Sequence, residues 1–132
     1  MRHLVLTLAL AATITACVPG SPVYFGPPLV ILVGDVQLFE ERQPVPMAEV
    51  CVFGTDTLCV ASDQHGAYRA EMREEMLLEG RSLTVRFRVQ GLPSALAELR
   101  DLETGDPTRV DCAISTRLTL SDRPVACLPI QR

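Results

Sequence analysis

Residues 83–90 read Leu-Thr-Val-Arg-Phe-Arg-Val-Gln, and this stretch decides the fold class. Apolar side chains occupy every odd position and polar side chains every even one. Because successive side chains of a β-strand point to opposite faces, the alternation predicts a strand with one buried and one solvated face. Strands of this kind are typical of antiparallel sheets that cover a core on one side only.

The same alternation lies upstream, where two short apolar runs flank Gly54-Thr55-Asp56. Gly and Asp favour turns, so residues 48–60 predict a β-hairpin centred on Thr55. In that register Cys51 faces Cys59, and the apolar residues beside them share the opposite face of the hairpin. Directly opposed residues have Cβ atoms about 4.5–5.5 Å apart, a spacing slightly wide for a disulfide and closest to it at a non-hydrogen-bonded pair.

Further alternating runs surround these two segments. Residues 29–38 are apolar on both faces at first and on one face later, and shorter runs follow at 68–72, 110–120 and 125–128. Turn-forming residues separate the runs at regular intervals. Six or seven short strands in this arrangement predict an all-β fold, a single antiparallel β-sandwich over residues 29–132.

One segment has a different period. Leu96, Leu99 and Leu102 are spaced by three residues, and Ser94 stands where the N-cap of a helix would be. This spacing predicts one short helix within residues 94–103.

A tight turn is expected at Ser62-Asp63-Gln64-His65-Gly66. Asp63 can accept backbone N–H bonds at its start, and Gly66 can supply a positive φ at its end. His65 is the only histidine outside the first three residues, and we expect it to be an exposed turn residue. The turn chemistry therefore predicts a structural role for Asp63 and Gly66.

The N-terminus has the pattern of an export signal. A positively charged start precedes eleven uncharged residues, 4–14, a run too short for a membrane span of about 20 residues. It ends in Ile14-Thr15-Ala16-Cys17, which resembles the lipobox of bacterial lipoproteins. The resemblance implies cleavage after Ala16, a lipid on the sulfur of Cys17, and acylation of the new amino group, typically with palmitate. The alternative is an ordinary export signal in which Cys17 is incidental.

Three parts of the chain are thereby expected: a signal peptide at 1–16, the lipidated cysteine with a Pro-rich tether at 17–28, and the domain at 29–132. Four prolines within residues 18–28 favour extended polyproline II, with a reach of up to about 34 Å. Two or more acyl chains anchor a protein stably. Val18 stands where enteric lipoproteins kept in the inner membrane have Asp, so we expect a bacterial cell-envelope protein held in the outer membrane.

The chain has five cysteines, an odd number that needs an explanation in an exported protein. If Cys17 carries lipid, four remain in a compartment that permits disulfides. Of the three possible pairings, the local ones, Cys51–Cys59 and Cys112–Cys127, are favoured because short-range closure suits the hairpin register. By reducing the entropy of the unfolded chain, the two disulfides would raise the free energy of unfolding by about 2.6 and 3.1 kcal/mol if they are unstrained. The alternative is four buried free thiols.

Three short segments carry a second resemblance. Val33-Gly34-Asp35-Val36, residues 44–52 and Ser62–Tyr68 resemble, in order and spacing, the regulatory-like domain of carboxypeptidases. The similarity covers residues 33–72 and departs from the family pattern at Met47, where Gly is frequent. It implies an immunoglobulin-like or transthyretin-like sandwich of about seven strands. In that family the domain is normally an accessory beside a catalytic or transport domain.

The composition excludes several kinds of chemistry. The chain has no Lys and no Asn, which excludes a P-loop, a Schiff-base lysine and N-glycosylation. Neither a zinc site nor a calcium loop is expected, because there is no Cys-x-x-Cys, His65 stands alone, and Asp63 lacks a following acidic repeat. No cofactor is expected either. Without the signal, eleven Arg stand against sixteen acidic residues, and this net charge of −5 disfavours nucleic acid as a partner.

The function expected from these residues is a non-catalytic binding or structural module, attached to the membrane through lipid on Cys17. An envelope protein or a glycan would be its partner. One alternative is an accessory subunit of a larger envelope complex, recruited through exposed edge strands, and another is a hydrolase with an unrecognised site. Arg69, Arg86 and Arg88 are candidates for a basic strip, although such residues more often form a solvated strand face.

Overall fold

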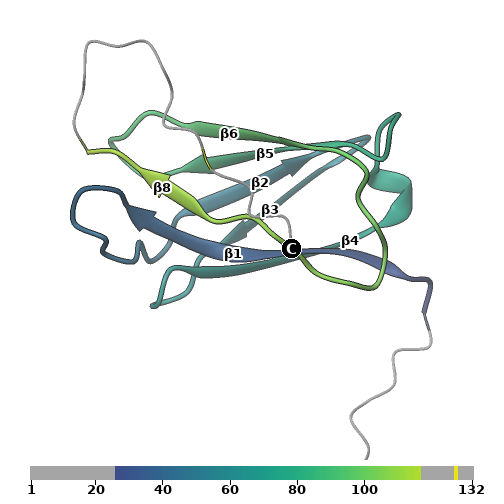
Figure 1. Ribbon diagram of the computed structural model, residues 1–132, viewed down its shortest axis with the longest axis horizontal. Helices are drawn as coiled ribbons and strands as arrows, with labels where there is room; N and C mark the ends of the chain where they lie inside the picture. The colour runs from purple at the N-terminus through teal and green to yellow at the C-terminus, as the bar shows by residue number, and fades with distance from the viewer. Residues whose placement is uncertain (1–25, 117–126, 128–132) are drawn as a thin grey trace, which may run out of the picture.

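Eight strands in two stacked sheets form the framework of the chain that the computed structural model describes, which is residues 26–116 and 127 (Figure 1). The predicted signal, Cys17, most of the tether and most of the run expected after residue 116 lie outside these residues. The elements are β1 (Leu29–Leu38), β2 (Glu49–Phe53), β3 (Thr57–Ala61), β4 (Ala67–Arg73), the 3₁₀ turn η1 (Glu74–Met76), β5 (Leu83–Arg88), β6 (Ala95–Leu99), β7 (Thr108–Arg109) and β8 (Cys112–Ile114).

The two sheets are built around different central strands. One sheet has the order β3-β2-β5-β6 and is antiparallel throughout. In the other, β4 pairs antiparallel with one side of the long strand β1, while β7 and β8 pair with its other side in parallel. The predicted β-sandwich is confirmed, and its last two strands close one edge by running parallel to β1.

The core lies between the sheets and follows the alternation seen in the sequence. On β5, Leu83, Val85 and Phe87 are buried, whereas the residues between them face outward. Val30 and Leu32 on β1 are fully buried in the same core cluster. The ring of Phe87 meets that of Tyr68 on β4 edge-on, with centroids 5.6 Å apart, which is a favourable aromatic geometry.

The predicted hairpin has the expected register. Cys51 on β2 lies directly opposite Cys59 on β3, and Val50 and Val52 pair with Val60 and Leu58. The two valines are fully buried on the core side of the sheet. The cysteines therefore project from its outer side, where they are joined as a disulfide.

The short helix predicted within residues 94–103 is wrong, because this segment contains the strand β6. Its small side chains Ala95 and Ala97 alternate with exposed ones and face the core, and Leu99 continues that face. Leu96 is 57% exposed, so the leucines spaced by three do not share one side. All five residues of β6 pair antiparallel with β5, and these ladder hydrogen bonds outweigh the weak local preference for a helix.

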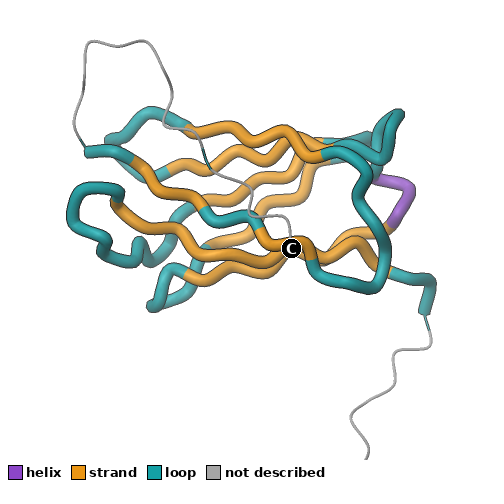
Figure 2. Tube along the Cα trace, viewed as in Figure 1, coloured by secondary structure: helices purple, strands orange, loops and turns teal. Residues whose placement is uncertain are grey.

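The loops gather at two opposite ends of the sandwich (Figure 2). The chain enters β1 at one end, where residues 54–56, 74–82 and 100–107 also lie; backbone bonds join Thr55 to Met76 and Gly105 to Leu29. Residues 39–48, 62–66 and 89–94 lie at the other end. No helix in the described part of the chain is long and apolar enough to span a membrane.

Candidate functional site

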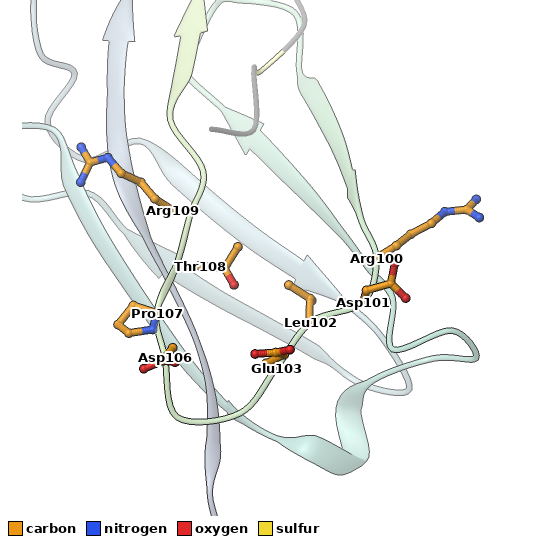
Figure 3. A pocket seen from close by; sticks show the side chains of 8 residues that line it. All are labelled: Arg100, Asp101, Leu102, Glu103, Asp106, Pro107, Thr108 and Arg109. Carbon is orange, nitrogen blue, oxygen red and sulfur yellow. The ribbon is translucent and has the colours of Figure 1, made fainter. Parts of the chain in front are cut away.

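A surface cleft of about 410 Å³ lies along the loop that joins β6 to β7 (Figure 3). The guanidinium groups of Arg100 and Arg109 point away from it in opposite directions, and the carboxylates of Glu103 and Asp106 lie along its rim. Sequence analysis did not predict this cleft. Among the described residues, no group of three or more His, Cys, Asp or Glu side chains is placed to hold a metal ion.

Arg109 binds the short segment between β7 and β8 to β1. Its guanidinium lies 2.5 Å from Asp35 and 3.0 Å from Asp111, and Asp111 also accepts the Asp35 backbone N–H at 2.9 Å. The hydrogen bond to Asp111 and its charge raise the pKa of Arg109. All three side chains are partly exposed, so solvent screens these ion pairs, and the cluster links β1 to the segment between β7 and β8.

Tyr68 binds the same segment from the core side. Its buried hydroxyl donates to the Val110 carbonyl at 2.6 Å, and the Val110 N–H donates to Val33 at 2.8 Å. Burial raises the pKa of Tyr68 above its ordinary value, with the negative charge of Asp111 adding to the effect. The phenol therefore stays protonated and acts as a structural donor.

The turn at residues 63–66 makes its own network of hydrogen bonds. The Asp63 carboxylate accepts the backbone N–H groups of His65 at 2.8 Å and Ala67 at 3.0 Å. The Asp63 carbonyl accepts the Gly66 N–H at 3.0 Å, and Gly66 has φ +76°. His65 is exposed in this turn. The described contacts of Asp63 and Gly66 thus lie within the turn and its neighbouring strands.

The outer side of the second sheet carries the most distinctive group of side chains. Arg86 on β5 lies beside the hairpin disulfide, with Nη2 3.7 Å from the Sγ of Cys51 and 3.3 Å from Glu49. Its guanidinium also covers the Phe53 ring, 5.1 Å from the centroid. The Nε of Arg86 is buried and has no partner among the described residues. Sequence analysis named Arg86 and Cys51 separately but did not predict this contact.

The basic strip considered from the sequence does not form. Arg86 and Arg88 lie on β5, whereas Arg69 lies on β4 in the other sheet, where it pairs with Glu71 at 2.7 Å. Three arginines on two sheets cannot bind one small anion together.

The second disulfide joins Cys112 on β8 to Cys127, and the two pairings are the local ones that the sequence favoured. Both of these residues are buried, with 1% and 4% of their surface exposed. The bond ties Cys127 to the strand that closes the parallel edge of the first sheet.

Glu40 sits at the surface beyond the end of β1 and binds the segment that leaves β8. Its carboxylate accepts the Ser115 hydroxyl, the Thr116 N–H at 3.0 Å and the Thr116 hydroxyl at 3.2 Å. The bond from Ser115, followed by that from the Thr116 backbone, lowers the pKa of Glu40 from 4.5 to about 2. The ionised form is therefore the one that holds this segment.

Ionised Glu40 is expected to stabilise the fold above pH 4.5, its ordinary pKa, and to lose that effect as the pH falls towards 2. Glu40→Gln should therefore melt earlier than the wild type at pH 6, and the difference in Tm should vanish by about pH 2. Thermal melts between pH 6 and pH 2 measure this. Glu41→Gln is the control, because Glu41 is exposed and has no hydrogen bond or ion pair with a described residue. A Glu40→Gln difference that stays constant over this range contradicts the prediction.

Comparison of the chain with protein-family models, and with curated proteins, found no match. Both resemblances noted in the sequence therefore remain predictions.

Proposed function

We propose that the protein is a lipid-anchored β-sandwich of the bacterial cell envelope, a non-catalytic binding or structural module similar to the regulatory-like domains of carboxypeptidases. The observation that carries the proposal is Ile14-Thr15-Ala16-Cys17 at the end of an uncharged run, followed by a Pro-rich segment that leads into the first strand. Lipid on Cys17 would hold the domain at the outer membrane.

The position of the loops supports this arrangement. Residues 26–28 enter the sandwich at one end, and β1 runs ten residues, about 33 Å, towards the other. A domain tethered at its entry end presents the opposite loops to the surroundings. Phe39 and Met47 project there, 62% and 78% exposed, as large apolar side chains available to a partner.

A Cys17→Ser variant tests the anchor. The wild type is expected to partition into the detergent phase and to sediment with membranes, because two or three acyl chains bind a bilayer stably. The variant should be recovered in the aqueous phase, with the same circular dichroism spectrum as the wild type. Equal partitioning of the two proteins into detergent would refute lipid anchoring through Cys17.

A second candidate function is an accessory subunit of a larger envelope complex. The edge strand β6 favours it, because its outer side carries the exposed Leu96 and, among the residues that the structure describes, β6 pairs with β5 alone. Unpaired strand edges recruit strands of other proteins. Affinity purification from solubilised envelope tests this function: one stoichiometric protein that is lost in a Leu96→Arg variant supports it, and recovery of glycan alone contradicts it.

A further inference from the structure

The two disulfides of the chain differ in what can reach them. Cys112 and Cys127 are both buried. Cys51 is buried as well, but its partner Cys59 is an exposed residue of the edge strand β3. Since thiol–disulfide exchange begins with a thiolate attacking one sulfur, access to that sulfur governs the rate. Between these two bonds, only Cys51–Cys59 has an exposed partner.

Arg86 makes the buried half of this bond a good leaving group. Its Nη2 lies 3.7 Å from the Sγ of Cys51, and its buried Nε has no partner among the described residues. A disulfide sulfur is a weak hydrogen-bond acceptor, whereas a thiolate is an anion that a neighbouring guanidinium stabilises. The interaction between Arg86 and the Cys51 sulfur is therefore more favourable when the disulfide is open and Cys51 is a thiolate than when the disulfide is closed.

We propose that Cys51–Cys59 is a thiol–disulfide exchange site that accepts two electrons from a dithiol reductant. A thiolate of the reductant attacks the Sγ of Cys59, the disulfide bond breaks, and its electron pair leaves on the Sγ of Cys51 beside Arg86. The second thiol of the reductant then attacks the mixed disulfide and releases Cys59. The reductant ends as a disulfide, and the protein gains two electrons and two protons, shared between Cys59 and the Cys51–Arg86 pair according to pH.

Two features of the same face oppose this chemistry. Burial disfavours a charged Cys51 sulfur, and the Glu49 carboxylate, 3.3 Å from Arg86, competes for its guanidinium. Among the described residues, the other charged groups on this side of the sheet are Arg88, opposite Glu49 in the register, and Glu98 on β6, with Arg100 just beyond β6 at 4.0 Å from Glu98. Removing Glu49 should therefore favour opening, and removing Arg86 should hinder it.

The test follows both disulfides of the full-length protein in detergent during incubation with dithiothreitol. Samples are quenched with an alkylating agent, and peptide mass mapping gives the opened fraction of each pair. Cys51–Cys59 should open at least about tenfold faster than Cys112–Cys127. Arg86→Leu should slow its opening about three- to tenfold, as expected for a rise of about one unit in the pKa of the leaving thiol, and Glu49→Gln should accelerate it.

Arg88→Leu is the matched control, because it removes the same charge from the same strand face two residues away. It should leave the rate within about twofold of the wild type. Arg86→Lys should restore most of the rate lost in Arg86→Leu, because it keeps the charge. In the reduced protein, the pH midpoint of Cys51 alkylation should rise in Arg86→Leu by about one unit, which a purely structural role would not produce.

Two outcomes overturn the proposal. Opening of both disulfides at the same rate would show that the exposure of Cys59 does not matter. Equal rates in Arg86→Leu and Arg88→Leu would show that the contact with Cys51 has no effect on the exchange.

Discussion

Gly34→Ala is expected to lower the free energy of unfolding by about 3–4 kcal/mol, the sum of an overpacked contact and a damaged buried hydrogen bond. A Cβ on Gly34 would lie 2.0 Å from the Val110 carbonyl oxygen and 3.0 Å from the Tyr68 ring. That oxygen is already fixed by the Tyr68 hydroxyl, and the Val110 N–H is bonded to β1. The backbone at Val110 must therefore move away, which weakens the pairing of β7 and β8 with β1.

Chemical denaturation of the full-length protein in detergent measures the effect. Tyr68→Phe serves as the control, since it removes the hydrogen bond to Val110 without adding an atom and should cost about 1 kcal/mol. If Gly34→Ala costs no more than Tyr68→Phe, the close approach of the two backbones does not limit the fold.

The partner of Gly34 illustrates what the sequence could not predict. The residues around Val110 alternate and were expected to form a strand, but alternation does not say which strand they pair with or in which direction. The structure places them alongside β1, in parallel and more than seventy positions away in the chain. Such a closure depends on tertiary packing between distant segments, which local periodicity does not contain.

Where local physics decides the structure, the sequence was sufficient. The turn at Thr55 fixes the register of its hairpin, so the contact of Cys51 with Cys59 followed directly. The alternation around Phe87 identified the buried face of β5. Over β6 the three-residue spacing of leucines was misleading. The decisive signal was the alternation of the small buried residues Ala95 and Ala97 with exposed ones, and this signal is weaker than an alternation of large apolar residues.

The contact of Arg86 with the disulfide could be predicted in part: the sequence indicates the face of each side chain but not that the two are neighbours. Both side chains could be assigned to the outer side of a sheet from the sequence alone. That they are neighbours depends on β5 pairing with β2, in the register that sets Arg86 opposite Cys51. The intervening segment of the chain includes β3 and β4, so the pairing is non-local and no turn specifies it. A site assembled from non-local strand pairs is visible only in the folded structure.

Gly66→Val is expected to destabilise the fold by about 3–5 kcal/mol, whereas His65→Ala should stay within about 0.5 kcal/mol of the wild type. Gly66 has φ +76°, a conformation that costs a β-branched residue about 1–3 kcal/mol. A Cβ there would also lie 2.5 Å from the Val36 carbonyl, which accepts the Val45 N–H at 2.9 Å. The valine would therefore strain the turn and separate it from β1. His65, one residue earlier, is exposed and leaves these contacts unchanged.

Asp63→Ala ranks between them, because it removes one carboxylate that accepts two backbone N–H groups at the surface and should cost about 0.5–1.5 kcal/mol. Chemical denaturation of the three variants gives the order Gly66→Val, Asp63→Ala, His65→Ala, from the least to the most stable. That order assigns the turn to the stability of the sandwich, since the exposed His65 side chain is the one whose loss matters least. If His65→Ala instead unfolds as readily as Gly66→Val, or alone abolishes binding to a purified envelope partner, His65 is a site residue and the turn is functional.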